Sequence, residues 1–296
     1  MTFLSVVIVL LVVQWWGSGR PLHKDRWFLS LWQRLDGLKK LPVALRLGLT
    51  LALPVLGLSL LWGALHQISA GFLLILCVNC LVLLYSLGRG DFSQPLQAYT
   101  EAAHADQSVR AVQIVDESNL DPALRAEPHP DDWLDLNHEA LRVFAYRGFE
   151  RMFAVLFWFL LLGAPAALAY RLLILLWQQL LQSNHPGAQG LGKVITWVEW
   201  PAACLMGLSW ALVGNFDACV AHWRHGCLHP FETTPVYLAR VLRGALGDND
   251  AAEPGSTQAV KIEPAFSLQM IEQMPGMFSR SLLLWVVVAA VITLIF

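Results

Sequence analysis

Two arginines, two acids and a histidine could together form an anion-binding pocket at the membrane surface. These residues are Arg89, Glu101, His104, Arg147 and Glu150. Arg89 and Arg147 would act as forked donors to a carboxylate or a phosphate, because a planar guanidinium can bind either group at two points. His104 follows Glu101 by three residues and therefore shares its helical face. Solvated surface charge is the simpler interpretation of the same residues, and their types favour it.

Two further charged residues lie inside segments that are otherwise apolar. Arg171 stands in WFLLLGAPAALAYRLLILLW, residues 158–177, and Glu199 is the only acid within a predicted membrane span. A charge at the bilayer centre costs on the order of 3 kcal/mol, so such a residue normally has a partner or a task. Two hypotheses stay open: the two side chains pair, either as a structural contact or as a ligand site, or each reaches the headgroups through its flexible stem.

Cysteine and histidine residues are the candidates for a metal or redox site. Five of them fall within eleven residues, namely Cys219, His222, His225, Cys227 and His229. Their spacing matches no standard zinc motif, so solvated histidines are favoured over a metal site. Cys77 and Cys80 form a CVNC pattern within a predicted span. There they are expected to be buried small apolar residues and not a thioredoxin-like pair.

No familiar catalytic motif occurs in the sequence. It contains neither a G-x-S-x-G nucleophile turn nor a G-x-x-x-x-G-K-[ST] phosphate loop. We therefore predict no catalytic residue, no metal and no cofactor from motifs alone. The net charge of -2 and the absence of a basic patch also exclude nucleic acid as a partner.

The elements that must position these residues are membrane helices. The chain is 56% hydrophobic and 14% charged, with a mean hydropathy of +0.52, whereas soluble domains have about 25% charged residues. A crossing needs about 20 predominantly apolar residues. Six segments meet this need, near 2–16, 47–65, 68–87, 153–181, 194–216 and 278–296. The sequence thus predicts an all-α, polytopic membrane protein, one integral-membrane domain over 1–296 with about six transmembrane helices and helical cytoplasmic segments.

The distribution of lysine and arginine orients these helices. Segments 17–46, 88–152 and 217–277 hold nearly all the basic residues and are expected in the cytoplasm, whereas loop 182–193 carries only Lys193 and is expected outside. As one straight helix, 153–181 would be about 43 Å long, more than the roughly 30 Å hydrocarbon core. It is either a hairpin folded at Gly163 and Pro165 or one tilted, kinked crossing, and the charge distribution favours the single crossing.

Three stretches of the sequence resemble a known family. FAVLFWFLLLGAPAALAYR, residues 153–171, is similar to the segment PLFWYLLGGLPGALLYR of the CobD (CbiB) membrane proteins of cobalamin synthesis. The likeness continues in VEWPAACLMGLSWALVG, residues 198–214, and in GRGDFSQPLQAYTEA, residues 88–102. With its length and span pattern, the whole chain resembles the AmpE branch of the AmpE/CobD family.

This resemblance implies a function different from cobinamide synthesis. The cobinamide-synthesising members have a polar NTLD stretch where this chain has the apolar ILLW of residues 174–177, and only Glu150 keeps an acid in the stretch before LFW. The AmpE branch implies a multi-pass protein of the bacterial inner membrane that acts in β-lactamase induction and peptidoglycan recycling. The implied partners are the lipid bilayer, a muropeptide or other anionic small molecule, and a cytoplasmic amidase of peptidoglycan recycling.

Two other functions are compatible with the same sequence. A membrane-embedded ligase-like enzyme acting on a cell-wall metabolite would retain the chemistry of the cobinamide-synthesising relatives. A muropeptide transporter is the third hypothesis, although no inverted repeat is visible in the chain.

Overall fold

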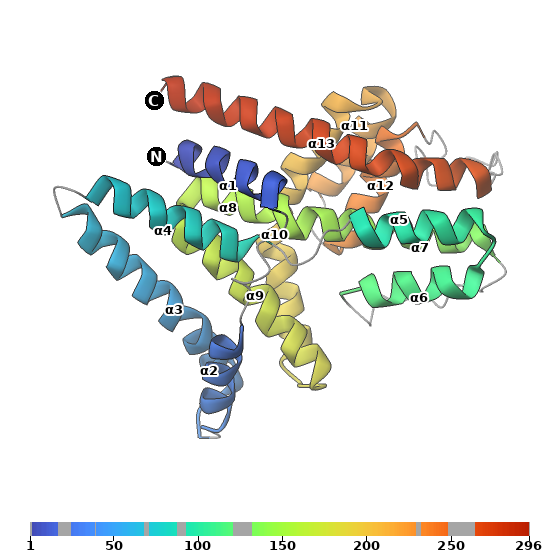
Figure 1. Cartoon of the computed structure of the whole chain (residues 1–296). Helices are drawn as coiled ribbons and strands as arrows, with labels where there is room; N and C mark the ends of the chain where they lie inside the picture. Colours follow the sequence, from blue (N-terminus) through green and yellow to red (C-terminus); the bar gives the residue numbers. More distant parts are fainter. Residues whose placement is uncertain are drawn as a thin grey trace. The chain divides into compact units, whose positions relative to one another are not determined.

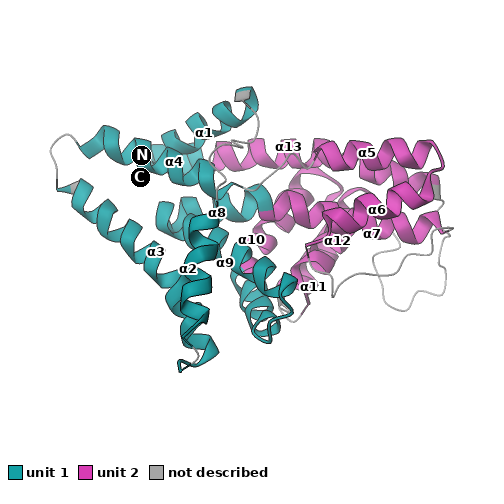
Figure 2. Cartoon of the chain, turned by 60° about the horizontal axis from the view of Figure 1, so that its bottom comes forward, with its two compact units in different colours: residues 1–90, 151–198, 289–296 teal, residues 91–150, 199–288 magenta. Residues whose placement is uncertain are grey.

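The structure, a computed structural model, describes residues 2–16, 25–38, 40–67, 71–87, 93–120, 132–228, 232–247 and 264–295. Over these residues it consists of helices and their connections and contains no strand (Figure 1). The expected all-α class is therefore confirmed. The chain divides into two compact units (Figure 2). Unit 1 comprises residues 1–90, 151–198 and 289–296, and unit 2 comprises 91–150 and 199–288.

Unit 1 contains the most apolar helices of the chain. They are α1 Thr2–Trp16, α2 Arg26–Asp36, α3 Val43–His66, α4 Gly71–Ser86, α8 Ala154–Leu162, α9 Ala164–Gln182, and α10 Ala188–Val213 as far as residue 198. Helix α9 packs against α3 and α4, and α1 packs against α4. Helix α2 contacts both α3 and α9, with Phe28 and Trp32 buried.

Unit 2 carries several short, more polar helices together with most of the long, apolar helix α13. They are α5 Ser93–His104, α6 Ser108–Ser118, α7 Trp133–Gly148, α11 Phe216–Leu228, α12 Thr234–Ala245, the rest of α10, and α13 Pro264–Ile295 as far as residue 288. Asp132 caps α7, because its side chain accepts from the backbone N–H of Leu134 at 3.0 Å and of Asp135 at 3.2 Å. Helix α7 approaches α13 closely, since a Cβ on Gly148 would lie 2.6 Å from the ring of Phe278.

Three of the described helices are long and apolar enough to cross a membrane. They are Val43–Leu65, Ala164–Gln182 and Ala265–Ile295, while α1 and α4 are apolar but shorter. The chain is therefore a membrane protein, but these lengths do not establish the six crossings expected from the sequence. The most apolar stretch of α9 is 67% buried within the protein, compared with 11% for α3 and 22% for α13. Helix α9 is thus shielded by other helices in a way that α3 and α13 are not.

Residues 153–181 do not form one continuous helix. Helix α8 ends at Leu162 and α9 begins at Ala164, because Gly163 has φ +82° and ψ -169°, a conformation that is essentially reserved for glycine. Pro165 lies in the first turn of α9, where its missing N–H is tolerated. The two helices pack against each other on either side of this break (Figure 1). The segment is therefore two helices that pack on each other, as in the hairpin hypothesis, while the single kinked crossing stays a prediction about the membrane.

Candidate functional site

Arg171 lies in a buried polar cluster of unit 1. Its side chain is 5% exposed, and its charge acts on the hydroxyl of Tyr85 near the end of α4. That hydroxyl donates to Asp25 Oδ1 at 3.2 Å, and Asp25 is itself 8% exposed. Trp27 lies beside Tyr85, with 6.4 Å between the ring centroids. An acid and a phenol therefore meet at the start of α2, and the charge of Arg171 acts on the phenol.

This cluster bears on the desolvation cost of Arg171. A buried charge is tolerated when opposite charge and hydrogen bonds compensate for its lost hydration, and the Tyr85 hydroxyl, hydrogen-bonded to Asp25, is one polar group on which the charge of Arg171 acts. Arg171 is enclosed by protein, so a long stem reaching out to the headgroups does not describe it. The proposed pairing with Glu199 stays a prediction, because Arg171 belongs to unit 1 and Glu199 to unit 2.

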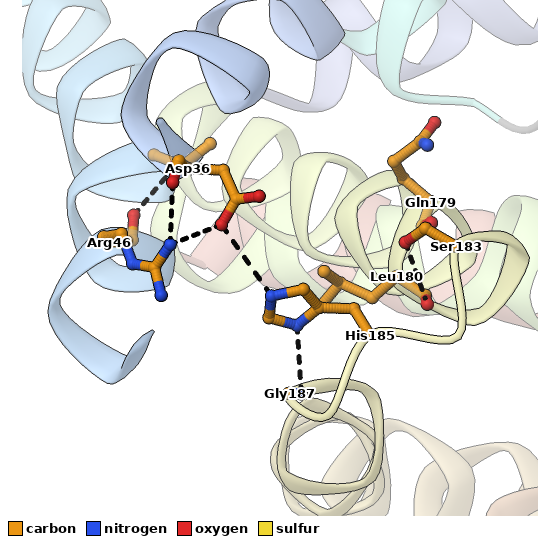
Figure 3. A network of polar contacts seen from close by, with 8 residues as sticks. Asp36, Arg46, Gln179, Leu180, Ser183, His185 and Gly187 are labelled. Carbon is orange, nitrogen blue, oxygen red and sulfur yellow. Dashed lines mark hydrogen bonds and ion pairs between the residues drawn. The ribbon is translucent and has the colours of Figure 1, made fainter. Parts of the chain in front are cut away.

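A second polar network of unit 1 joins the end of α2 to the residues that follow α9 (Figure 3). Arg46 Nη1 donates to Asp36 Oδ1 at 2.6 Å and to the Asp36 carbonyl at 2.8 Å. The same carboxylate oxygen lies 3.7 Å from His185 Nε2. His185 Nδ1 accepts from the backbone N–H of Gly187 at 3.0 Å. The proton of a neutral His185 ring therefore resides on Nε2, which faces Asp36.

This network contradicts part of the expected membrane topology. Segment 17–46 and loop 182–193 were expected on opposite sides of a hydrocarbon core of about 30 Å. Asp36 and His185 instead lie in direct contact, and the ring of Trp32 packs edge-on against that of His185, with 5.7 Å between centroids. The residues that follow α9 therefore lie at the same end of unit 1 as the residues that precede α3.

Glu199 forms a buried polar contact of α10 in unit 2. Its side chain is 1% exposed, and its Oε1 accepts from the hydroxyl of Tyr146 on α7 at 3.0 Å. Tyr146 is 5% exposed. The hypothesis that Glu199 reaches the headgroups is therefore wrong, because the carboxyl group is enclosed between helices.

Glu150 lies in the short π-helical turn Phe149–Phe153 that follows α7. Such turns insert one residue into a helix and occur frequently at functional sites. Glu150 is 2% exposed, and Arg147 precedes it by three residues and is half-buried. Tyr146, Arg147, Glu150 and Glu199 in unit 2 are hereafter called the π-turn site.

Glu101 and His104 do not belong to this site. Helix α5 runs antiparallel to α7, because Trp133 Nε1 donates to Asp106 Oδ1 at 2.8 Å and Tyr99 donates to Asn137 Oδ1 at 2.6 Å. His104 therefore lies near the beginning of α7, about 20 Å along that helix from its end. There His104 Nε2 contacts Glu272 Oε1 at 2.7 Å, and Glu101 is exposed.

The expected five-residue anion pocket is thus not assembled as one site. Of its members, Arg147 and Glu150 lie at the end of α7, whereas Glu101 and His104 lie near its start. Arg89 lies outside the described residues. Local sequence spacing placed Glu101 and His104 on one helical face correctly but could not reveal the direction in which α5 runs against α7.

A buried hydrogen-bond chain holds α5, α7 and α13 together in unit 2. The hydroxyl of Tyr99 donates to Asn137, whose amide nitrogen donates to Ser267 Oγ at 2.8 Å. Burial raises the pKa of Tyr99 well above its ordinary value, so the hydroxyl stays protonated and acts as a donor. This chain of hydrogen bonds fixes the helix that carries Tyr146 and leads into the π-helical turn with Glu150.

The cysteine and histidine candidates do not converge on one point. Within the described part of the chain, no three of the His, Cys, Asp and Glu side chains could hold a metal ion together. The thiol of Cys219 points to the carbonyl oxygens of Gly207 at 3.8 Å and Val241 at 3.6 Å, and His229 lies outside the described residues. Cys77 is exposed and Cys80 partly exposed, so the expectation that both are buried is wrong.

Comparison with known proteins decides the family. The family model described as "Regulatory signalling modulator protein AmpE" matches residues 1–261. The chain belongs to the AmpE family. No curated protein and no solved structure matches it. The membership confirms the resemblance in the sequence, and the AmpE description supports a signalling or accessory role.

Sequence reasoning on this AmpE chain missed Asp25, Tyr85, Asp36, His185 and Tyr146. Asp25 stands between Lys24 and Arg26, where an acid is easily read as solvated charge. Tyr85 near the end of a predicted span resembles an ordinary interfacial aromatic residue. The one available signal was the presence of buried charges at Arg171 and Glu199, which require polar partners on other helices.

Proposed function

We propose that this chain is a multi-pass protein of the bacterial inner membrane that modulates signalling in β-lactamase induction and peptidoglycan recycling. In this proposal it binds an anionic small molecule, with a muropeptide as the first candidate, at the cytoplasmic face of the membrane. The bound state is then sensed by a cytoplasmic partner, for which the amidase of peptidoglycan recycling is the candidate. Membership in a family of regulatory signalling modulators supports this role.

The π-turn site is the observation that carries the proposal. It keeps two carboxyl groups, those of Glu150 and Glu199, almost fully buried in unit 2. Burial of an ionisable group is costly and is most often retained for function or for a compensating contact. The hydroxyl of Tyr146 donates to Oε1 of Glu199 at 3.0 Å. Arg147, half-buried two residues before the π-helical turn, is the group that would meet an anion there.

Complementation of a strain that lacks its own copy tests the proposal. Arg147→Gln and Glu150→Gln should lower β-lactamase induction while the protein is still found in membranes at its normal level. Glu101→Gln and His104→Ala serve as matched controls, because both residues are exposed near the other end of α7. An equal loss of induction in all four variants, or none in any, would reject the π-turn site as the sensing site.

Native mass spectrometry of gently extracted protein tests ligand binding. A muropeptide or other anionic molecule should be retained by the wild-type chain and by His104→Ala, and lost from Arg147→Gln. Retention by all three proteins would place the ligand elsewhere. Added muropeptide that binds none of them would show that this ligand class is wrong.

The proposal includes a membrane topology with four crossings. Helices α1, α3, α4 and α13 cross, whereas α8 and α9 form a re-entrant pair that enters and leaves on the cytoplasmic side. Helix α8, with nine residues, spans about 14 Å, half of the hydrocarbon core. The contact of Asp36 with His185 supports the return of α9 to the side of segment 17–46.

This topology also improves the charge distribution. Helix α10 carries Lys193 near its start and the buried Glu199, and in this topology it does not cross. If α10 does not cross, Lys193 moves to the cytoplasm while Arg224, Arg240 and Arg243 stay there. The excess of basic residues on the cytoplasmic side then holds for every loop. The sequence-based objection to a hairpin, that it would reverse all later segments, no longer applies.

A further inference from the structure

Two cysteine thiols meet between α10 and α11 of unit 2. The side chains of Cys204 and Cys227 are hydrogen-bonded to one another. Both are free thiols with partly exposed side chains. The hydroxyl of Tyr237 on α12 lies 3.6 Å from Cys227 Sγ. A sulfur pair from two helices and a phenol from a third therefore share one small region.

Close helix packing holds this pair in place. A Cβ on Gly226 would lie 2.2 Å from ring atoms of Tyr237, so that ring rests directly on the backbone next to Cys227. A Cβ on Gly207, one turn after Cys204, would lie 2.7 Å from the Tyr237 hydroxyl. Trp223 Nε1 also donates to the carbonyl oxygen of Cys204 at 2.8 Å. Helices α10, α11 and α12 thus fix the two sulfur atoms relative to each other.

The surroundings of Cys227 favour its thiolate. The hydrogen bond from Cys204, with a smaller contribution from Tyr237, lowers the pKa of Cys227 to about 7 from an ordinary value of 9.0. A thiol with such a pKa is about half ionised at neutral pH, whereas an ordinary one is only about 1% ionised. Cys219 provides the contrast, because burial raises its pKa to about 12. The thiolate is the nucleophilic form of cysteine, so Cys227 is the reactive member.

We propose that Cys204 and Cys227 form an oxidation-sensitive modification site, in which a peroxide converts the two thiols into a disulfide that joins α10 to α11. This inference is independent of the function proposed above. It assigns Cys227 as the attacking residue and Cys204 as the resolving residue. It rests on the packing around Tyr237, whose hydroxyl lies 3.6 Å from Cys227 Sγ and against Gly207, one turn after Cys204. The hydrogen bond between the two thiols agrees with this placement.

The chemistry balances with hydrogen peroxide as oxidant. The Cys227 thiolate attacks one peroxide oxygen, so an S–O bond forms, the O–O bond breaks, and hydroxide leaves and is protonated to water. The Cys204 sulfur then attacks the sulfenic sulfur of Cys227, so the S–S bond forms, the S–O bond breaks, and a second water leaves with the Cys204 proton. The two thiols lose two electrons in total, and one peroxide is reduced to two waters.

Peroxide treatment of the purified full-length chain in detergent tests the site. Remaining thiols are alkylated with N-ethylmaleimide, and the digest is analysed by mass spectrometry with and without dithiothreitol. We expect one linked pair, the peptides that contain Cys204 and Cys227, two hydrogens lighter than the reduced pair and released by dithiothreitol. Full alkylation of both cysteines after peroxide, or a link from either one to Cys77, Cys80 or Cys219, would overturn the proposal.

A trapping experiment assigns the two roles. In Cys204→Ser the sulfenic acid has no resolving thiol, so dimedone should label Cys227. In Cys227→Ser neither dimedone labelling of Cys204 nor a disulfide should form. Cys219→Ser is the matched control and should form the 204–227 link at the wild-type rate. Dimedone labelling of Cys204 in Cys227→Ser, at the rate seen for Cys227, would show that the assigned order is wrong.

Discussion

The carboxylate of Asp36, at the end of α2, lies 3.7 Å from the imidazole of His185, just beyond the end of α9. At the other end of α2, the Asp25 carboxylate accepts a hydrogen bond from the hydroxyl of Tyr85. The charge of Arg171, in the middle of α9, acts on the same hydroxyl. Helix α2 therefore lies alongside the second half of α9. The two contacts set the position of α9 relative to a segment that the lysine and arginine distribution assigns to the cytoplasm.

Cysteine labelling of spheroplasts checks the re-entrant topology. In a chain whose five native cysteines are replaced by serine, Ser183→Cys should resist an impermeant maleimide, because it follows α9 on the cytoplasmic side. Gln67→Cys, an exposed position between α3 and α4, should be labelled and serves as the control. Efficient labelling at 183 would restore the single crossing of residues 153–181.

Gly163→Ala should destabilise the protein. Its backbone angles, φ +82° and ψ -169°, are accessible to glycine but strained for alanine, a cost of about 1 to 3 kcal/mol. Gly57→Ala in α3 is the matched control, because a Cβ there meets nothing within 4 Å, and alanine is the better helix former by about 1 kcal/mol. Thermal unfolding in detergent measures the stability of both variants. Equal melting temperatures for the two variants would mean that the bend at Gly163 is not required.

Arg171→Leu should cost stability because it removes a buried charge from a compensated cluster. The loss can reach about 3 to 5 kcal/mol when one member of a buried pair is removed. Two double-mutant cycles in detergent separate the partners, one with Asp25→Asn and one with Glu199→Leu. We expect a coupling energy above about 0.5 kcal/mol in the Asp25 cycle. The pairing of Arg171 with Glu199 that the sequence predicts requires a coupling energy of that size in the Glu199 cycle. Additive losses in both cycles would show that neither acid compensates Arg171.

Tyr146→Phe should destabilise the protein more than Tyr99→Phe. Both lose one buried hydroxyl hydrogen bond, but Tyr146 donates to the Glu199 carboxyl group and Tyr99 to the neutral amide of Asn137. Leaving a buried polar group without a donor costs about 1 to 3 kcal/mol, with more for a charged acceptor. Melting temperatures of the two single variants give the comparison. A smaller loss for Tyr146→Phe would indicate that other contacts already satisfy Glu199.

The alkylation rate of Cys227 should depend on pH with a midpoint near its pKa of about 7. The rate rises as pH increases through this midpoint, because the thiolate is the reacting form. Tyr237→Phe keeps the ring against Gly226 but removes the hydroxyl, so the midpoint should move to higher pH. Cys219, with a pKa raised to about 12, should stay unreactive throughout neutral pH in the folded protein. A Cys227 midpoint near 9 in the wild type would contradict the assigned environment.

The class of the protein and much of its helix pattern could be predicted from the sequence. The apolar composition favours a membrane over water as the surroundings of the folded chain. The apolar runs that predicted spans at 2–16 and 47–65 coincide with α1 and most of α3. The same reasoning singled out Arg171 and Glu199, because an ionisable residue in an apolar segment is costly wherever it lies. Both are indeed buried. Residue type and local spacing determine these features.

The tertiary structure alone decided which residues meet. The contact of Asp36 with His185, the hydroxyl of Tyr146 on Glu199, and the distance of His104 from Glu150 depend on the directions in which helices pack. Those directions follow from side-chain packing across helices distant in sequence, which periodicity along one segment does not encode. The bend at Gly163 shows the same division: glycine and proline marked a possible break, but only packing of α9 against α3, α4 and α8 selected two helices over one.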